Sequence, residues 1–258
     1  MNELVVTSHK TQREGADPLD AVSFADVRYS WPGPSPFTLT IAQFVLGRGE
    51  KLLLLGPSGS GKSTFLSLLA GIVGPNEGRI DVVGTDMAKL SGASRDRFRV
   101  DHFGIIFQMF NLLPYASLID NVLLPLRFSR VRRENALSEG SLEDVAKRVL
   151  VALGLDETVI ATSKAASLSV GQQQRVAAAR ALIGSPQIIV ADEPTSALDR
   201  NTEGAFLKLL FEQSAKAGAS VIMVSHDEGL APHFDRVVRL QDIAVSTRGV
   251  ASTRGVGP

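Results

Sequence analysis

The sequence predicts an α/β fold built on a mostly parallel sheet, and three observations support this prediction. Four short apolar runs rich in branched residues recur along the chain, and each is followed at once by a polar group. The runs are apolar throughout and do not alternate, as expected of strands that helices bury on both faces. The first run leads directly into a glycine-rich loop and a helical pattern. The four runs are Lys51–Leu55, Phe103–Phe107, Ile188–Ala191 and Val221–Ser225.

Composition excludes several classes of function. The chain has 258 residues, of which 44% are hydrophobic, enough for one large domain or a core with an insertion. Lys plus Arg and Asp plus Glu both number 27, so no global basic field attracts nucleic acid. Cysteine is absent, which excludes disulfides and thiolate metal sites and suits a reducing cytosol. No apolar run approaches the ~18 to 20 residues that cross a bilayer, and the N-terminus has no secretory h-region.

The chain divides into a leader, one domain and a tail. Residues 1–20 are polar and aperiodic, which predicts a flexible leader before a first strand around Val22–Tyr29. Residues 244–258 contain a short polar repeat and predict a flexible tail. Between them, a core of residues 21–107 and 170–243 is interrupted by residues 108–169. This interruption has helical spacing, which predicts a helical insertion.

The insertion also carries an arginine cluster. Arg127, Arg130, Arg132 and Arg133 precede an acidic stretch. We interpret the cluster as a solvated helix end, and the alternative is contact with a membrane surface or a partner.

The glycine-rich loop after Lys51–Leu55 predicts phosphate binding. Its glycines let successive N–H groups point at an anion, and the following helix directs the positive end of its dipole to the same place. Lys62 can reach the β- and γ-phosphates, and the Ser63 hydroxyl can coordinate Mg²⁺. The sequence therefore predicts a nucleoside triphosphate site, the alternative being a plain glycine linker. The loop consists of Gly56, Pro57, Ser58, Gly59, Ser60, Gly61, Lys62, Ser63 and Thr64.

The polar groups that follow the other three runs are expected to converge on this loop, because ligands of open α/β sheets bind beyond the carboxyl ends of the strands. Asp192 is the expected carboxylate near the metal, and Glu193 is placed to activate water. Alternatively, both carboxylates could belong to the coordination shell of the metal. Gln108 can offer its amide oxygen to Mg²⁺ or the water, or it caps the following helix. His226 can hydrogen-bond the γ-phosphate and Glu193, unless it is an ordinary strand-end histidine.

A further segment predicts a second anion site at a helix start. Ser169 is a good N-cap, and Gln172 completes a capping box before Val176–Ile183, which Gly184 ends. As structure this is a well-capped helix. As function, its free N–H groups, the serine hydroxyl and close approach at Gly171 form a site for an anion.

With these motifs in this order, the chain from Val22 to Leu240 resembles the ATPase subunit of an ATP-binding cassette (ABC) transporter. The resemblance implies a P-loop NTPase core with a mostly parallel sheet, an N-terminal antiparallel β subdomain and an inserted α-helical subdomain, and it implies ATP and Mg²⁺ as cofactors. The motifs are the phosphate loop, Gln108, Leu168–Gln172, Ile188–Glu193, Ser196–Asp199 and His226.

In that family two subunits pair head to tail, and each ATP lies between one subunit's Walker loop and the other's signature helix. The resemblance therefore implies a homodimer or a paired ATPase subunit. In it Ser169, Gly171 and Gln172 contact ATP in trans, and Asp199 takes part in coupling across the dimer.

The resemblance also implies roles within one subunit. Glu193 is the expected catalytic base, with Lys62 and His226 as the other catalytic residues. Trp31 is expected to stack on adenine, with Tyr29 as the alternative, and either can be a packed aromatic instead.

Two departures from the family pattern stand out. Val170 replaces the usual signature glycine, and we expect less loop freedom with activity retained. The region after Leu240 lacks the usual glycine-containing hairpin.

Phe103–Leu126 resembles ATPases that power lipoprotein release and macrolide efflux, and it is also similar to methionine importers. Those importers usually carry a C-terminal regulatory domain, for which this chain ends too early, so the export type is favoured. The resemblance implies integral membrane permease subunits and a peripheral location on the cytoplasmic face of the inner membrane, and it implies no nucleic-acid partner.

The alternatives are an importer ATPase and a soluble ABC ATPase acting on DNA or ribosomes. A soluble ABC ATPase of that kind usually carries two cassettes or a long coiled coil. A kinase or nucleotide switch outside the family leaves the signature helix unexplained.

Overall fold

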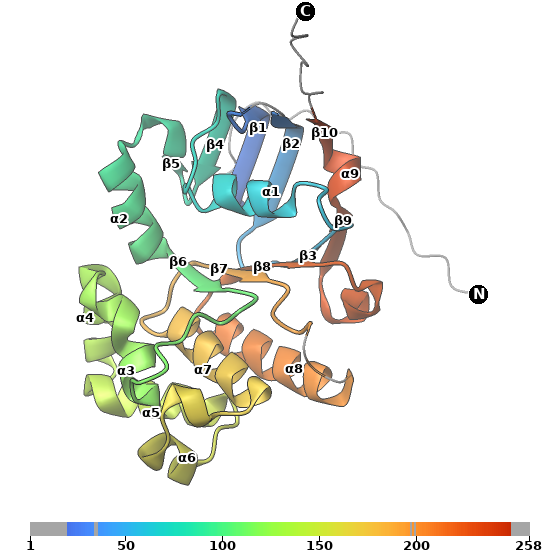
Figure 1. Ribbon diagram of the computed structural model, residues 1–258. Coiled ribbons are helices and arrows are strands. Elements are labelled where there is room, and N and C mark those ends of the chain that lie inside the picture. Colours follow the sequence, from blue (N-terminus) through green and yellow to red (C-terminus); the bar gives the residue numbers. More distant parts are fainter. Residues whose placement is uncertain (1–19, 34–35, 197, 199, 249–258) are drawn as a thin grey trace, which may run out of the picture.

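The computed structural model describes residues 20–33, 36–196, 198 and 200–248, and it contains two sheets separated by a helix (Figure 1). One sheet has five strands in the order β6-β7-β8-β3-β9, and the other has five in the order β10-β2-β1-β4-β5. Helix α1 lies between the two sheets, whereas α7 and α8 cover the opposite face of the first sheet (Figure 1). The predicted α/β class with helices on both faces of the sheet is confirmed.

The first sheet is parallel at every pairing given for it, as the four apolar runs predicted. All four runs lie in it as neighbours, and β9 joins at one edge. Most of their side chains are buried because helices pack on both faces. The strands are β3 (Lys51–Leu55), β6 (Phe103–Ile106), β7 (Ile188–Asp192), β8 (Ser220–Ser225) and β9 (Arg236–Arg239).

The second sheet is antiparallel and forms the N-terminal β subdomain that the family resemblance implied. Its long strands β1 and β2 pair along most of their length, with Phe24 opposite Phe44. The strands are β1 (Asp20–Ser30), β2 (Phe37–Gly47), β4 (Glu77–Val82), β5 (Thr85–Asp86) and β10 (Ala244–Arg248).

Strand β10 corrects the predicted C-terminal boundary. Residues 244–248, assigned above to a flexible tail, pair with β2 in antiparallel register from Ala244 opposite Ile41 to Arg248 opposite Phe37. A short polar strand at a sheet edge lacks the apolar run used to identify strands, which explains the difference. The remaining parts of the predicted leader and tail, residues 1–19 and 249–258, lie outside the described residues.

Helices fill the connections between the strands. Ser169 caps α7 with the predicted capping box, and Gly184 follows its end at φ 71°. The α-helices are α1 (Lys62–Leu69), α2 (Gly92–His102), α3 (Leu118–Leu123), α4 (Arg130–Ser138), α5 (Leu142–Ala152), α6 (Glu157–Thr162), α7 (Val170–Leu182), α8 (Arg200–Lys216) and α9 (Leu240–Ile243). The 3₁₀ helices are η1 (Met87–Lys89), η2 (Leu124–Arg127), η3 (Ala165–Ser167) and η4 (Glu228–His233). In the described part of the chain, no helix is both long and apolar enough to span a membrane.

Two hydrophobic cores flank the parallel sheet. The core on the α1 side joins both sheets, and the Phe65 ring of α1 stacks on Phe24 with ring centroids 5.2 Å apart. The core on the α7 side joins the sheet to α8 and to the helical insertion, which forms α3 to α6. Both faces of the parallel sheet are therefore buried, and the strand ends remain for a ligand.

The arginine cluster of the insertion is not uniformly solvated. Arg132 of α4 is only 2% exposed, and burial lowers the pKa of its guanidinium to about 10. The guanidinium donates hydrogen bonds to the carbonyl oxygens of Phe103, Ala181 and Ile183, at 2.9, 2.8 and 2.6 Å for the shortest contacts. Arg132 therefore caps the end of α7 and attaches the insertion to the start of β6. The interpretation as a solvated helix end is wrong for this residue.

Helix α7 also lies very close to strand β6. A Cβ atom placed on Gly104 would come within 2.2 Å of the Ala181 carbonyl oxygen, which is backbone and has little freedom to move. Glycine at this position lets the helix and the strand that leads to Gln108 pack in direct contact.

We predict that Gly104→Ala lowers the free energy of unfolding by about 1–3 kcal/mol, because the added methyl group overpacks the contact between α7 and β6. Urea unfolding measures the change. Gly92→Ala is the control, since a methyl group added to Gly92 at the start of α2 would meet no heavy atom within 4 Å, and alanine favours helix. Equal stability of the Gly104→Ala variant and the wild type would show that the helix and strand are further apart than described.

Candidate nucleotide-binding site

One cavity of about 870 Å³ collects most of the residues that the sequence singled out. It lies at the carboxyl ends of β3, β6, β7 and β8, where the polar groups were expected to converge. The lining residues are Trp31, Phe37, Pro57, Ser58, Gly59, Gly61, Lys62, Ser63, Thr64, Gln108, Asp192, Glu193 and His226.

The loop before α1 has the backbone geometry that anion binding requires. Gly59 and Gly61 have φ of 75° and 109°, in the left-handed region that favours glycine. A side chain on Gly61 would also meet Phe37 and Leu39 at 3.0 Å, so this position is restricted twice. Gly61 is the N-cap of α1, and no side chain caps that helix end. Its first N–H groups are therefore available to an anion.

Lys62 is held at the mouth of this loop. Its Nζ donates hydrogen bonds to the carbonyl oxygens of Gly56 and Pro57 at 2.6 and 3.1 Å. The same ammonium lies 3.5 Å from the Glu193 carboxylate, and both side chains are largely buried. A lysine fixed by its own loop presents a positive charge at a defined point of the cavity.

Trp31, rather than Tyr29, faces the cavity. Trp31 is 40% exposed, and its Nε1 donates a hydrogen bond of 3.0 Å to the Thr64 hydroxyl at the end of the phosphate loop. Tyr29 is 8% exposed and packs edge-on against Trp31, with ring centroids 5.2 Å apart. The tyrosine thus supports the tryptophan, and the exposed indole is the aromatic surface available to a base.

Two ionisable side chains, Glu193 and His226, meet opposite the loop. The backbone N–H of Glu193 donates to the Val224 carbonyl at 2.9 Å, and Glu193 adopts φ 43°, which is unusual for a residue with a side chain. A hydrogen bond of 3.1 Å joins His226 Nδ1 to Glu193 Oε2. This contact matches the predicted pairing of the histidine with the glutamate.

Asp192 ends β7 beside Glu193, and its surroundings disfavour the ionised form of its carboxyl group. Burial raises the pKa of the Asp192 carboxyl, and the negative charge of Glu193 raises it further, while Lys62 acts in the opposite direction. A carboxylate that is held close to another acid and partly removed from water is stabilised by a cation. Such an arrangement suits a site for a metal ion.

Gln108 also reaches the cavity, from the end of β6. The alternative that it caps the following helix is wrong, since the next helix, α3, begins at Leu118 and is capped by Ser117.

Some predicted site residues lie elsewhere. Ser169, Gly171 and Gln172 at the start of α7 do not line the cavity of their own chain. Gly56 and Ser60 belong to the phosphate loop but do not line the cavity, and the buried Ser60 hydroxyl has no hydrogen-bond partner among the described atoms. Asp199 lies outside the described residues.

Phe37 lines the cavity from the start of β2, although no sequence signal pointed to it. Phe37 belongs to no motif, and only the pairing of β1 with β2 brings it beside Trp31 and the phosphate loop. The hydrogen bond from Trp31 to Thr64 could not be predicted from the sequence either, since Trp31 follows β1 and Thr64 lies in α1.

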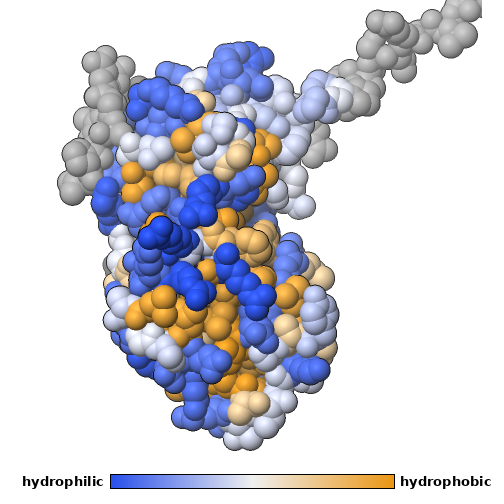
Figure 2. Space-filling model, turned by 90° about the vertical axis from the view of Figure 1, so that its left-hand side faces the viewer, coloured by the Kyte–Doolittle hydropathy of each residue, from blue (hydrophilic) through white to orange (hydrophobic). Residues whose placement is uncertain are grey.

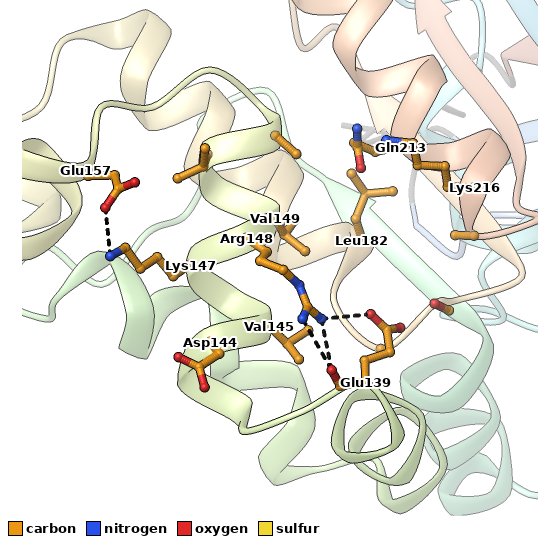
Figure 3. A pocket seen from close by; sticks show the side chains of 15 residues that line it. Glu139, Asp144, Val145, Lys147, Arg148, Val149, Glu157, Leu182, Gln213 and Lys216 are labelled. Carbon is orange, nitrogen blue, oxygen red and sulfur yellow. Dashed lines mark hydrogen bonds and ion pairs between the residues drawn. The ribbon is translucent and has the colours of Figure 1, made fainter.

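A second hollow, of about 780 Å³, lies between α5 and the ends of α7 and α8 (Figure 3). Lys147 pairs with Glu157 at 2.8 Å and Arg148 pairs with Glu139 at 3.3 Å, so these cations are already compensated (Figure 3). None of the motif residues named above lines this hollow.

The fold and the cavity define a nucleotide hydrolase of the phosphate-loop class. The family model described as ABC transporter matches residues 39–196, which is more than half of the chain. The chain belongs to the ABC transporter family, as an ATP-binding cassette that hydrolyses ATP.

Curated relatives and solved structures agree with this assignment. The uncharacterized ABC transporter ATP-binding protein YbbA of Escherichia coli (strain K12) is 41% identical over 202 residues, which cover 78% of this chain and 85% of that protein. The lipoprotein-releasing system ATP-binding protein LolD of Chromohalobacter salexigens is 36% identical over 209 residues, which cover 81% and 85%. The dimeric structure of MJ0796, a bacterial ABC transporter cassette, matches with a TM-score of 0.73 and 33% identity over 84% of this chain and 93% of that one. The same cassette is known in a post-hydrolysis state bound to ADP and Pi.

We predict that Asp192→Asn raises the melting temperature of the nucleotide-free protein at pH 7. The folded state raises the pKa of Asp192 above its unfolded value, so the ionised carboxylate costs stability at neutral pH. That cost disappears as the pH falls below the usual range of an aspartate, where the carboxyl is protonated in both states. Melting temperatures of both proteins across this pH range measure the difference, which should grow with pH.

Asp156→Asn is the matched control. Hydrogen bonds from Thr158 lower the pKa of the exposed Asp156, so its ionised form is favoured in the folded state and its replacement should bring no gain at pH 7. A gain of equal size in both variants would contradict the electrostatic explanation.

Proposed function

We propose that this chain is the ATP-hydrolysing subunit of an ABC transporter of the export or lipoprotein-release type. In this proposal it dimerises on ATP and acts through integral membrane permease subunits at the cytoplasmic face of the inner membrane. The observation that carries the proposal is the cavity in which the phosphate loop, Gln108, Asp192, Glu193 and His226 meet. Each of these groups has a task in phosphoryl transfer to water.

The residues of the cavity fit Mg²⁺. Ser63, Gln108 and Asp192 would hold it, and they offer a hydroxyl, an amide oxygen and a carboxylate, the oxygen ligands that Mg²⁺ prefers. No group of three or more His, Cys, Asp or Glu side chains that could hold a metal occurs within the described ranges. This agrees with Mg²⁺ bound through nucleotide phosphates and few protein ligands. The ion would neutralise charge on the phosphates.

The chain's own residues would divide the remaining work. The loop N–H groups and Lys62 bind and orient the phosphates, and Trp31 stacks on the base. Glu193 accepts a proton from the attacking water, and His226, hydrogen-bonded to Glu193 Oε2, orients that carboxylate. The Glu193 carboxylate lies 3.5 Å from Lys62 Nζ and 3.1 Å from His226 Nδ1. This supports separate roles for the two neighbouring acids.

The position of the signature helix supports a dimer with ATP at the interface. Ser169, Gly171 and Gln172 are outside the cavity of their own chain, yet they form a helix start with the features of an anion site. A second subunit placed head to tail would bring this helix start to the ATP of the first. The cassette MJ0796, which is similar over 84% of this chain, forms a dimer.

Surface properties and relatives support a membrane partner of the export type. Large apolar side chains are exposed in the segment that follows Gln108, with Met109 81% and Tyr115 73% exposed. Figure 2 shows hydrophobic areas among hydrophilic ones on the face that α2 and α4 help to form. Exposed apolar surface of this kind marks contact with another protein. A similar chain, LolD, belongs by name to a lipoprotein-releasing system.

We predict that Glu193→Gln keeps ATP binding and lowers the hydrolysis rate by about 10²–10⁴-fold, because the amide keeps the shape of the side chain but accepts no proton. The ATP-bound variant should accumulate as a dimer. Sizing chromatography with ATP and a phosphate-release assay measure the two effects. Trp31 is the only tryptophan of the chain, so its fluorescence reports ATP binding.

Lys62→Ala is the control for this experiment. It removes the cation that binds the phosphates, so it should abolish tight ATP binding, the fluorescence change and the dimer together. A monomeric Glu193→Gln variant with full activity would refute the assigned role of the glutamate.

We predict that the chain, purified from its native membrane in mild detergent, brings an integral membrane protein with it. Mass spectrometry identifies the companion, and an adjacent permease gene with a large extracytoplasmic loop would favour export over import. A Met109→Glu, Tyr115→Glu double variant is the matched control. It places two charges on the exposed apolar surface and should release the companion while ATP hydrolysis by the isolated subunit continues. Recovery without a membrane partner, or salt-sensitive binding of nucleic acid, would oppose the transport role.

A further inference from the structure

Helix α7 makes buried side-chain contacts with the two turns that carry Gln108 and Glu193. These contacts come from Gln174 and Arg180, which no motif discussed above includes, and both side chains are buried, with 1% and 7% exposure. Buried polar side chains of this size need specific partners. Here the partners are backbone carbonyl oxygens at the edge of the nucleotide cavity.

Gln174 holds the turn after the predicted catalytic base. Its Nε2 donates a hydrogen bond of 2.9 Å to the carbonyl oxygen of Pro194, the residue that follows Glu193. The Gln174 Oε1 has no hydrogen-bond partner in the part of the chain that the structure describes. The side chain therefore serves this turn as a donor. Glu193 itself has φ 43°, a backbone conformation that persists only when surrounding contacts hold it.

Arg180 holds the turn after Gln108 in a similar way. Its Nη1 donates a hydrogen bond of 2.7 Å to the Asn111 carbonyl, and its Nη2 donates to the Phe110 carbonyl. Phe110 and Asn111 have φ of 57° and 49°, again in the left-handed region. One guanidinium thus fixes two consecutive residues in an unfavourable backbone conformation.

The helix that carries both donors is itself fixed to the sheet. Arg132 binds the carbonyl oxygens at the C-terminal end of α7 and the Phe103 carbonyl of β6, and Gly104 lets the helix lie directly against that strand. Short, buried contacts therefore connect α7 to both turns.

We propose that Gln174 and Arg180 are positioning residues, through which helix α7 holds the turns bearing Glu193 and Gln108 in the geometry needed for ATP hydrolysis. This inference rests on the roles proposed above for Glu193 and Gln108. It adds a link between two parts of the proposed dimer. The same helix begins at Ser169. A nucleotide held by the opposite subunit and bound to this helix start would therefore act, through α7, on the hydrolysis site of the subunit that contains the helix.

The test compares substitutions along α7 in the full chain. Arg180→Met and Gln174→Met remove the donors and keep most of the side-chain volume. The kcat for ATP hydrolysis should fall about tenfold or more, because orphaned carbonyls let the strained turns relax. Loop N–H groups and Lys62 are unchanged, so the Kd for ATP, from Trp31 fluorescence, should stay within about threefold.

Arg175→Met is the matched control on the same helix. Arg175 also donates to two consecutive carbonyl oxygens, those of Leu153 and Gly154 at 3.0 and 2.8 Å, but these belong to the turn between α5 and α6. Its replacement should lower the melting temperature without reducing kcat. Equal kcat losses in the Arg175 and Arg180 variants, or wild-type kcat in the Gln174 and Arg180 variants, would overturn the proposal.

Two further measurements keep the outcomes distinct. If Arg180→Met does not fold, Gln174→Met decides, since it removes a single amide from a helix that Arg180 still secures. Glu193→Gln is measured in the same assay. A fully active Glu193→Gln variant refutes the role proposed for Glu193, on which this inference rests, whereas an inactive one beside a normal Gln174→Met variant refutes only the positioning role.

Discussion

Parallel hydrogen bonding between β6, β7, β8 and β3 is the constraint on which the rest of the structure depends. Parallel pairing directs the carboxyl ends of these strands to one edge of the sheet. The polar residues that follow the four strands, although far apart in the sequence, therefore meet at this edge. It also requires that both faces be covered, which places α1 above the sheet and α7 and α8 below it (Figure 1). The cavity is a direct result of this arrangement.

The site contains backbone conformations and a carboxyl environment that are unfavourable in themselves, and contacts with the surrounding fold maintain them. Asp192 is partly desolvated beside another acid, and Glu193, Phe110 and Asn111 adopt left-handed backbone conformations. Asp192 and Glu193 line the cavity, Phe110 and Asn111 form the turn after Gln108, and each arrangement costs stability. Buried donors on α7 and the lysine of the phosphate loop offset part of this cost, which explains why polar side chains are found inside an otherwise apolar helical layer.

Much of the fold and site could be predicted from the sequence where one segment carries a complete local signal. The strand Lys51–Leu55 and the capping box at Ser169 and Gln172 are confirmed, because apolar runs and caps are local properties. Phe37, Gln174 and Arg180 could not be found this way. Phe37 reaches the cavity through the pairing of β1 with β2, whereas Gln174 and Arg180 bind carbonyl oxygens of distant segments. Every residue type has a carbonyl oxygen, so the sequence does not indicate which ones are bound. The interpretation of Arg132 was wrong for the same reason, since a buried guanidinium and a solvated one look alike in a sequence.

The pairing of β10 with β2 has a consequence for how the folded chain avoids self-association. It places the two strands of 11 residues, β1 and β2, inside the antiparallel sheet, whose outer strands are β10 with five residues and β5 with two. Long exposed strand edges recruit other chains into shared sheets, whereas short ones offer few free N–H and C=O groups. The C-terminal strand thus protects the β subdomain from aggregation through the edge of β2, one of its two longest strands.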